Sequence, residues 1–508
     1  MKDKILRNSL SNGISFITRA LLSFIITPIL IKRLGNDLFG VWALLVGLSG
    51  YFGLLDLGMR SAIVKYTSEY HAKNKYDEMN NIISTTRTLF VGMGILSWVI
   101  MILLSFLMNK IFNLNLNINV NYLQLFVIIG ADMFFTFYFM IYQGVIAGIQ
   151  RYDLIVRNGL IGLFLRAVLI LLYIKRDGGI LTLSIIFLVS NLTVYLLNVI
   201  TLKSIFGALH LSFGLTKISD LKKVWRYSWK SFVINVADRI IYYSDSIIIG
   251  IFLDPEHITY YAIASSLIVY LWSLISSVAG VTIPAISAAD GVGDMKDIRR
   301  MVIKGTRVIL FILIPIFCCL IILGRDFIQL WIGKGYEQSY KVLVILLVSQ
   351  FLTLSQYGMT LVLYGIAEHG FLANINIIIA VVNVALSILF IQLWGLVGIA
   401  LASSIALCFF RLIFIPARVL RIIGMRFETL WAEAFVPSVK IGIAYAIFLI
   451  LCKYQIKSIS WVTFFLMLTV SLIFYISIYY WVGLNGEERR YSNTSIKKYY
   501  MKLKGIMT

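Results

Sequence analysis

The chain has 508 residues, of which 60% are hydrophobic and only 14% are charged, and its mean hydropathy is +0.90. An apolar excess of this size excludes a water-soluble fold and predicts a polytopic membrane protein. The net charge of +21 raises the question of a polyanionic partner. The basic residues alternate from one connection to the next instead of forming one patch, so we expect no nucleic-acid partner.

Apolar runs follow one another from Asn8 to Gly483, separated by short polar breaks, and we count about fourteen of them. Each is about 20 residues long, the length of helix that crosses the hydrocarbon core of a bilayer. Because a backbone exposed to lipid must satisfy its hydrogen bonds within its own segment, these runs predict an all-α fold with about 14 transmembrane helices. The first run is not followed by a cleavage site of small residues, so we expect it to be retained.

Lys and Arg are distributed unevenly between the two sides that these spans define. With the N-terminus placed inside, inward connections hold 30 of the 45 basic residues, outward connections hold 10, and the other five lie within spans. This bias follows the positive-inside rule and predicts that both termini are cytoplasmic. The inward segments are 2–7, 60–87, 151–157, 203–230, 296–307, 418–426 and 489–504.

The two halves of the chain resemble each other at a shift of about 218 residues. LGNDLFGVWA (34–43) aligns with LDPEHITYYA (253–262), and GIQRY (148–152) aligns with GIAEH (365–369). Both copies begin on the cytoplasmic side, so the repeat predicts two parallel six-helix lobes followed by two extra C-terminal helices. The predicted divisions are an N-lobe (1–203, spans 1–6), a cytoplasmic linker (204–225), a C-lobe (226–417, spans 7–12), spans 13 and 14 (418–483) and a basic cytoplasmic tail (484–508).

The seventh span carries three charged and two further polar side chains. Asn235, Asp238, Tyr242 and Asp245 follow the spacing i, i+3, i+7, i+10, which places them along one helix face, with Arg239 about 100° to the side. A charge at the centre of a membrane helix costs roughly 2.5 to 3.5 kcal/mol, so such residues face protein or water. The stripe therefore predicts a central, water-accessible cavity between the two lobes.

Three more charged residues lie within spans of the first half. The repeat places Arg19 of the first span at the depth of Asp238. Asp132 and Arg166 lie at equal distances from the turn near Ile149, hence at matched depth in a hairpin of two spans. Each of these charges has two interpretations, a structural ion pair or a role in the cavity, and the sequence leaves both open.

No motif indicates a metal, a cofactor or a catalytic centre. The four cysteines lie in apolar runs and the four histidines are scattered without ligand spacing, so we expect neither disulfides nor a metal. The sequence contains no GxxxxGK[ST] loop, so we expect no direct coupling to ATP hydrolysis and no cofactor.

Three features identify a family resemblance: the glycine-bearing break after the first span, the LDLG sequence that ends the second, and an Asn-rich then Gly-rich pair in the eleventh and twelfth. Through residues 10–44, 50–70 and 374–404, the chain resembles polysaccharide-export and O-antigen flippases of the multidrug/oligosaccharidyl-lipid/polysaccharide superfamily. The resemblance implies alternating-access transport of an undecaprenyl diphosphate-linked oligosaccharide from the cytoplasmic to the periplasmic leaflet of the bacterial inner membrane. The product would be O-antigen lipopolysaccharide or another surface polysaccharide.

The resemblance also implies roles for the charged residues, because a guanidinium stays charged and offers a planar fork of donors to a diphosphate. The residues expected to bind substrate are Arg19, Arg166, Arg239, Asn235 and Tyr242, and Arg19 matches the span in which the related lipid II flippase carries a cavity arginine. Those expected to balance charge or couple an ion are Asp132, Asp238 and Asp245. The implied partners are the lipid-linked oligosaccharide and membrane lipids. Polymerase and chain-length proteins of the same pathway are left open.

Two other classes remain as alternatives. A polytopic glycosyltransferase or polymerase of the same pathway would need a sizeable external catalytic loop, and the longest outward candidate, 324–341, is short. A cation-coupled drug exporter of the same superfamily would be expected to carry an acidic first span instead of one with an arginine. We therefore expect a transporter, not an enzyme, and the sequence does not specify the sugar.

Overall fold

The computed structural model describes residues 2–114, 120–174, 179–207, 209–456, 459–484 and 489. Throughout these residues the regular structure is helical, which confirms the predicted all-α class. Eleven of the described helices are long and apolar enough to cross a membrane, so the chain is a multi-pass membrane protein. The predicted tail lies outside the described residues except at 484 and 489.

The chain divides into two compact units, each of which is described by itself. The first comprises Met1–Ser266 and Gly370–Ala406, and the second comprises Leu267–His369 and Leu407–Thr508. The elements up to residue 252 are α1 (Lys2–Leu34), α2 (Asn36–Phe52), η1 (Gly53–Asp56), α3 (Met59–Ala72), α4 (Tyr76–Ile111), α5 (Tyr122–Gly148), α6 (Tyr152–Tyr173), α7 (Gly179–Ile205), η2 (Phe213–Leu215) and α8 (Ile218–Phe252). The others are α9 (Pro255–Ala279), η3 (Gly280–Thr282), α10 (Ile283–Gly291), α11 (Met295–Trp331), α12 (Glu337–Ser355), α13 (Tyr357–Gly365), α14 (His369–Ile423), α15 (Phe427–Leu430), η4 (Trp431–Phe435), α16 (Val436–Tyr454), α17 (Trp461–Ile478) and η5 (Tyr479–Gly483).

The count of fourteen spans and the lobe boundaries stay predictions. The helices α1 and α8, 33 and 35 residues long, are not among the eleven candidate spans. The helix α14 counts once, although its backbone leaves the helical region at Gly395 (φ 56°, ψ −134°), where two helices meet. Counting α1, α8 and both parts of α14 as spans would give fourteen.

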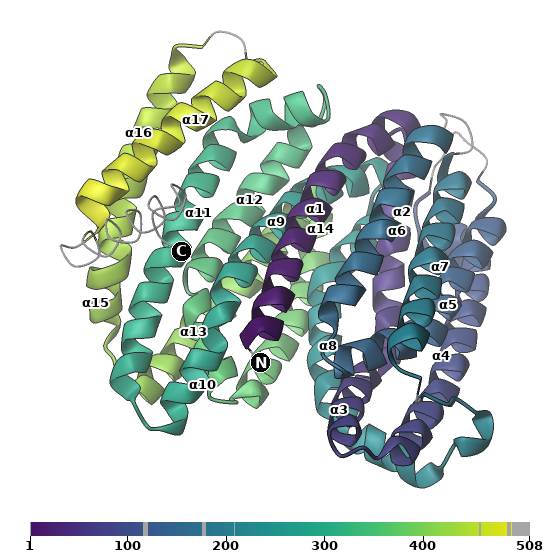
Figure 1. The fold of residues 1–508 in the computed structure, drawn as a ribbon. Coiled ribbons are helices and arrows are strands. Elements are labelled where there is room, and N and C mark those ends of the chain that lie inside the picture. Colours follow the sequence, from purple (N-terminus) through teal and green to yellow (C-terminus); the bar gives the residue numbers. More distant parts are fainter. Residues whose placement is uncertain are drawn as a thin grey trace, which may run out of the picture. The chain divides into compact units, whose positions relative to one another are not determined.

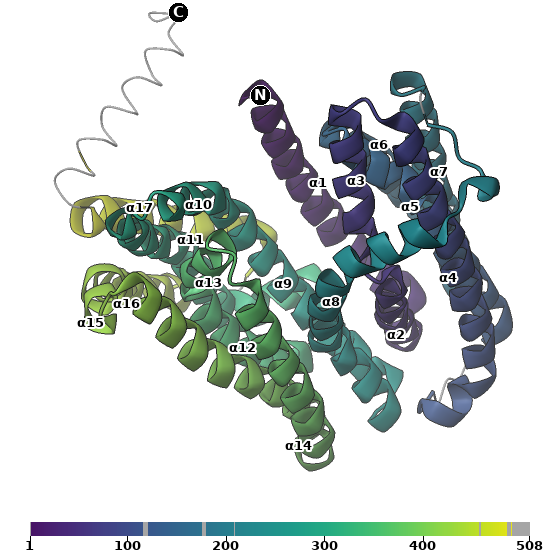
Figure 2. The ribbon, with the colours of Figure 1, turned by 90° about the horizontal axis from the view of Figure 1, so that it is seen from below.

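In the first unit, α5 packs against both α4 and α7, and α6 packs against α7 and α1 (Figure 1). The side chains of Ile63, Phe90 and Phe137 are buried where α3, α4 and α5 meet. Glycine permits the close approach of α3 and α5, because a Cβ on Gly148 would lie only 2.5 Å from the Cβ of Thr67. The start of α8 passes across the ends of α3 and α4 (Figure 2).

In the second unit, α11 packs against α12 and α16, and α16 packs against α17. Aromatic side chains fill the contact among α11, α16 and α17. The Tyr475 ring lies 5.5 Å from that of Phe311 and 5.1 Å from that of Tyr445, and the Tyr475 hydroxyl donates to the Phe311 carbonyl at 3.0 Å. The phenol is therefore buried with its polar atom satisfied, as an apolar environment requires.

The two copies of the aligned GIQRY and GIAEH motifs form the same turn. Gln150, between α5 and α6, has φ of 61°, and Ala367, between α13 and α14, has φ of 62°. The backbone N–H of Gln150 donates to the carbonyl three residues before it, and that of Ala367 does the same. A left-handed conformation at corresponding non-glycine residues is uncommon enough to support the internal repeat.

This turn gives a test of stability. We expect Ala367→Gly to raise the midpoint of thermal unfolding, because a left-handed alanine costs roughly 1–2 kcal/mol and glycine removes most of that strain despite its greater freedom when unfolded. Gln150→Gly should act in the same direction. Ile366→Gly is the control, since φ at Ile366 is −90° and glycine relieves nothing there. Equal or lower midpoints for both left-handed positions would show that the turn is not strained.

Candidate functional site

Arg239 lies on α8, and neutral groups hold its guanidinium. Its Nη1 donates to the Gly50 carbonyl of α2 at 3.2 Å and to the Tyr243 hydroxyl at 3.4 Å, and the guanidinium lies 5.5 Å from the centre of the Tyr243 ring. Glycine in η1 makes room for it, because a Cβ on Gly53 would lie 3.1 Å from the guanidinium carbon. The described hydrogen bonds of Arg239 therefore go to neutral groups and not to the neighbouring carboxylates.

Asp238 and Asp245 both bond to polar side chains of α14. Asn376 donates to Asp238 at 3.0 Å, and Ser403 donates to Asp245 at 2.9 Å. The two carboxylates are seven residues apart, so hydrogen bonds two turns apart tie α8 to this helix. The other members of the predicted stripe, Asn235 and Tyr242, are exposed. Their part in substrate binding stays a prediction.

Asp245 is the most deeply buried of the predicted site residues, with 6% of its surface exposed. Its Oδ2 accepts from both the Tyr261 hydroxyl and Ser403, and Ser403 in turn accepts from Asn383 at 2.9 Å. Asn383 and Ser403 lie on opposite sides of the break at Gly395, which folds one part of α14 back on the other. The other carboxylate oxygen has no donor among the described residues. This carboxylate can therefore accept a proton or a small cation.

A second polar cluster joins α5, α6 and α7. Arg166 donates to the Asn191 side-chain oxygen at 2.6 Å, and the Asn191 amide donates to both carboxylate oxygens of Asp132, at 3.0 and 2.8 Å. The guanidinium also lies 4.0 Å from the centre of the Phe187 ring. The matched depth of Asp132 and Arg166 is thus observed, but an asparagine bridges them where the sequence suggested a direct pair.

Asn191 is the residue that the sequence analysis missed. The argument that matched Asp132 with Arg166 across one turn also applies to the next hairpin. Arg166 and Asn191 lie at nearly equal distances from the connection between α6 and α7, which predicts that they meet. An asparagine carries no charge, so it does not stand out in an apolar span as an aspartate or an arginine does.

Arg19 lies on α1 and is exposed. The helix packs against α6, and a Cβ on Gly159 of α6 would lie 3.7 Å from the Arg19 guanidinium. The structure thus places Arg19 near α6, whereas the repeat relates it to Asp238 on α8. That Arg19 and Asp238 line one cavity stays a prediction.

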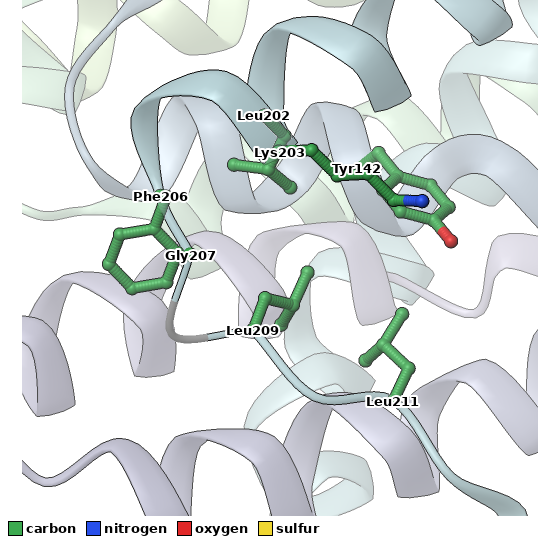
Figure 3. Close-up of a pocket in the computed structure, with 7 residues that line it drawn as sticks. All are labelled: Tyr142, Leu202, Lys203, Phe206, Gly207, Leu209 and Leu211. Atoms are coloured by element: carbon green, nitrogen blue, oxygen red, sulfur yellow. The ribbon is translucent and has the colours of Figure 1, made fainter.

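A separate cavity of about 390 Å³ opens between α5, α7 and the segment that follows α7 (Figure 3). Its lining is apolar except for Tyr142 and Lys203. Tyr142 is ten residues beyond Asp132 on α5, or about 15 Å along the helix axis. This cavity contains none of the predicted site residues.

Solved structures of transporters share this fold. The lipid II flippase MurJ, in an inward closed conformation, superimposes with a TM-score of 0.72 and 17% identity, covering 93% of this chain and 98% of MurJ. An inward-facing multidrug resistance MATE family transporter of the MOP superfamily gives a TM-score of 0.67 and 13% identity, covering 83% and 98%. The chain therefore has the fold of MOP-superfamily transporters.

The sequence comparison defines the family more closely. The family described as "Polysaccharide biosynthesis protein" matches residues 5–289, and the chain belongs to this family. A candidate O-antigen transporter of Shigella flexneri is 18% identical over 420 residues, which are 79% of this chain and 94% of that protein. A probable low-salt glycan biosynthesis flippase of Haloferax volcanii, Agl15, is 24% identical over 205 residues, 39% of this chain. The chain spans 43% of the length of Agl15 in that match.

The bridge at Asn191 can be tested by an apolar replacement of similar size. We expect Asn191→Leu to lower the midpoint of thermal unfolding by several degrees, because each buried polar group that loses its partner costs about 1–3 kcal/mol. Thr193→Val on the same helix is the control, since the Thr193 hydroxyl only bonds to the backbone of its own helix. Unfolding of purified protein in detergent, followed by tryptophan fluorescence, provides the measurement. Equal midpoints for the two variants would contradict a stabilising bridge.

Proposed function

We propose that this protein is a flippase for an undecaprenyl diphosphate-linked oligosaccharide, which it moves from the cytoplasmic to the periplasmic leaflet by alternating access. The product serves the assembly of O-antigen or another surface polysaccharide. The observation that carries the proposal is that Arg166 and Arg239 lie within membrane helices and bond there to neutral groups. Their charges remain available to an anion, whereas a directly bonded carboxylate would have to be displaced first.

The chemistry of the substrate supports the same assignment. A sugar headgroup loses several kcal/mol for each hydroxyl stripped of water without a new partner, and a diphosphate loses far more. Such a headgroup crosses a bilayer slowly unless a polar path is provided. Guanidinium groups bind phosphate oxygens in pairs, which makes Arg19, Arg166 and Arg239 the proposed contacts of the diphosphate. The names of the relatives, a flippase and an O-antigen transporter, are consistent with this substrate class.

Asp245 is the proposed site of ion coupling. Its open carboxylate oxygen and the neighbouring donors form a group that binds a proton or cation without a bonded arginine. The membrane potential supplies a second driving force, since moving two negative charges outward is favourable by about 2.3 kcal/mol per charge per 100 mV. Asp132 and Asp238 would balance the charge of the arginines.

A cation-coupled drug exporter is the second candidate function, favoured by the Asp245 cluster and by the fold shared with MATE transporters. It explains the buried carboxylate but not the arginines of the membrane helices, whose positive charge would repel cationic drugs. We therefore favour the flippase. We propose transport and no enzymatic reaction, with the protein in the bacterial inner membrane and both termini cytoplasmic.

The proposal is tested in proteoliposomes that contain a fluorescent undecaprenyl diphosphate-linked oligosaccharide. We expect the protein to increase the fraction of headgroups that change leaflet, measured as fluorescence accessible to an impermeant quencher. Ethidium efflux in the same vesicles tests the alternative. Efflux of ethidium without movement of the lipid-linked sugar would support the exporter and overturn the flippase.

Arg239 provides the variant for this assay. We expect Arg239→Ala to abolish flipping at normal protein levels, and Arg239→Lys to restore only part of it, because a point charge cannot reproduce paired contacts with a diphosphate. Arg411→Ala, which removes another arginine of a predicted span, is the control and should keep most of the activity. If Arg239 acts only by balancing a carboxylate, a double variant with Asp238→Asn should flip normally, and that result would overturn the proposed contact.

The orientation gives an independent test on α11, whose 37 residues span about 55 Å at 1.5 Å per residue. In a variant without the four native cysteines, a cysteine at Gly291 should react only with reagent on the cytoplasmic side. A cysteine at Lys334, beyond the other end of α11, should react only from the periplasm. The reverse pattern in intact cells would place the termini outside.

A further inference from the structure

The second unit contains a strongly basic pocket beside the N-terminal part of α11. Its cavity measures about 360 Å³. Five cationic side chains and one carboxylate line it, together with one isoleucine. The lining residues are Lys296, Arg299, Arg300, Ile303, Lys304, Arg307 and Glu433. None of them belongs to the candidate transport site, so the pocket needs a separate explanation.

The basic side chains share one face of α11. Lys296, Arg300, Lys304 and Arg307 follow the spacing i, i+4, i+8 and i+11, which is the repeat of a helix face. The helix begins at a fixed point, because the side chain of Asp294 accepts from the backbone N–H of Asp297 at 3.0 Å. Core residues of α11 such as Ile298 and Val302 occupy a different face and are fully or almost fully buried. The basic face is therefore not part of the packing core.

Two of the arginines are held in place by backbone carbonyls of the second unit. The Arg299 Nε donates to the carbonyl of Ile423 at 2.5 Å, and the Arg307 Nε donates to the carbonyl of Glu433 at 2.7 Å. These bonds orient the guanidinium planes at the edge of the pocket. Preorganised guanidinium groups lose less entropy when they bind phosphate oxygens. The other three cations, Lys296, Arg300 and Lys304, are exposed and can adapt to an anion.

An aromatic stack adjoins the pocket and indicates its depth in the membrane. The rings of Phe427 and Trp431 lie 6.1 Å apart, and those of Trp431 and Phe435 lie 5.3 Å apart. Trp431 is two residues from Glu433 and 47% exposed. Exposed tryptophan is enriched at the level of lipid headgroups, and Lys and Arg are enriched on the cytoplasmic side. Val308, next to Arg307, is also 48% exposed and offers an apolar contact for an acyl chain.

We propose that this pocket binds the phosphate headgroup of an anionic phospholipid from the cytoplasmic leaflet. The cations supply charge-assisted hydrogen bonds to the phosphate, and the aromatic stack and Val308 contact the glycerol and the chains. Bound there, the lipid joins the start of α11 to the connection between α14 and α16. The site is independent of the proposed transport function, because its lining residues all belong to the second unit and the candidate transport site belongs to the first.

The test measures lipid retention by the full-length protein. Purified protein is mixed with phosphatidylglycerol or phosphatidylcholine of the same chain length, and bound lipid is counted by native mass spectrometry. We expect a clear preference for phosphatidylglycerol. The combined substitutions Lys296→Gln, Arg300→Gln and Lys304→Gln should reduce its binding at least about tenfold, since each basic residue near an anionic headgroup contributes on the order of 1 kcal/mol. The control carries Lys217→Gln, Lys222→Gln and Arg226→Gln, the same charge change at exposed residues of the first unit, and should bind as the unmodified protein does.

Three outcomes would overturn the proposal. One is equal retention by the pocket variant and the control. The second is displacement of phosphatidylglycerol by about 1 mM inorganic pyrophosphate, which would assign the pocket to a soluble anion. The third is displacement by equimolar undecaprenyl diphosphate, which would assign it to the transported lipid. If the pocket variant fails to fold, as judged by circular dichroism, the unmodified protein still decides: retention that does not fall between about 0.1 and 0.5 M NaCl would exclude an ionic site.

Discussion

The high cost of leaving a charged group unbonded in an apolar environment is the constraint on which the first unit depends. The carboxylates within its helices bond to polar side chains of neighbouring helices. Asn191 bridges Asp132 and Arg166, Asn376 bonds to Asp238, and Ser403 and Tyr261 bond to Asp245. Because an unpaired charge within hydrocarbon costs several kcal/mol, these bonds restrict which helices can be neighbours and at which depth. The polar clusters thus determine the helix arrangement as well as the candidate chemistry.

Neutral partners have a different consequence from ion pairs. Asparagine, serine and backbone carbonyls satisfy the hydrogen bonds of a charged group without cancelling its charge. The guanidinium of Arg239 is oriented by a carbonyl and a tyrosine, and the carboxylate of Asp245 by two hydroxyl groups. A group held in this way is preorganised and can exchange a weak partner for a charged ligand at low cost. A transporter that binds and releases a charged substrate in each cycle requires such an arrangement.

The internal repeat is expressed in backbone geometry more than in side chains. The turns at Gln150 and Ala367 have the same left-handed residue, although their motifs share little identity. The polar sites differ, because the shift of 217 residues that aligns these turns relates Asp132 to Ser349 and Arg166 to Asn383. The charged residues of the first half therefore have uncharged counterparts in the second. A shared scaffold thus carries different side chains in its two copies, which fits the view that function resides in sites placed on a fold.

Several features of this protein were determined by the sequence alone. Hydropathy predicted a membrane protein of α-helices, since the bilayer permits few other backbone structures, and the matched depth of Asp132 with Arg166 followed from a single hairpin. Only the tertiary structure showed that Asn191 lies between them, that α14 folds back at Gly395 to bring Asn383 to Ser403, and that Arg239 bonds to Gly50. These contacts join helices far apart in the chain. Helical periodicity determines which face a residue occupies, but the packing of other helices decides what that face meets.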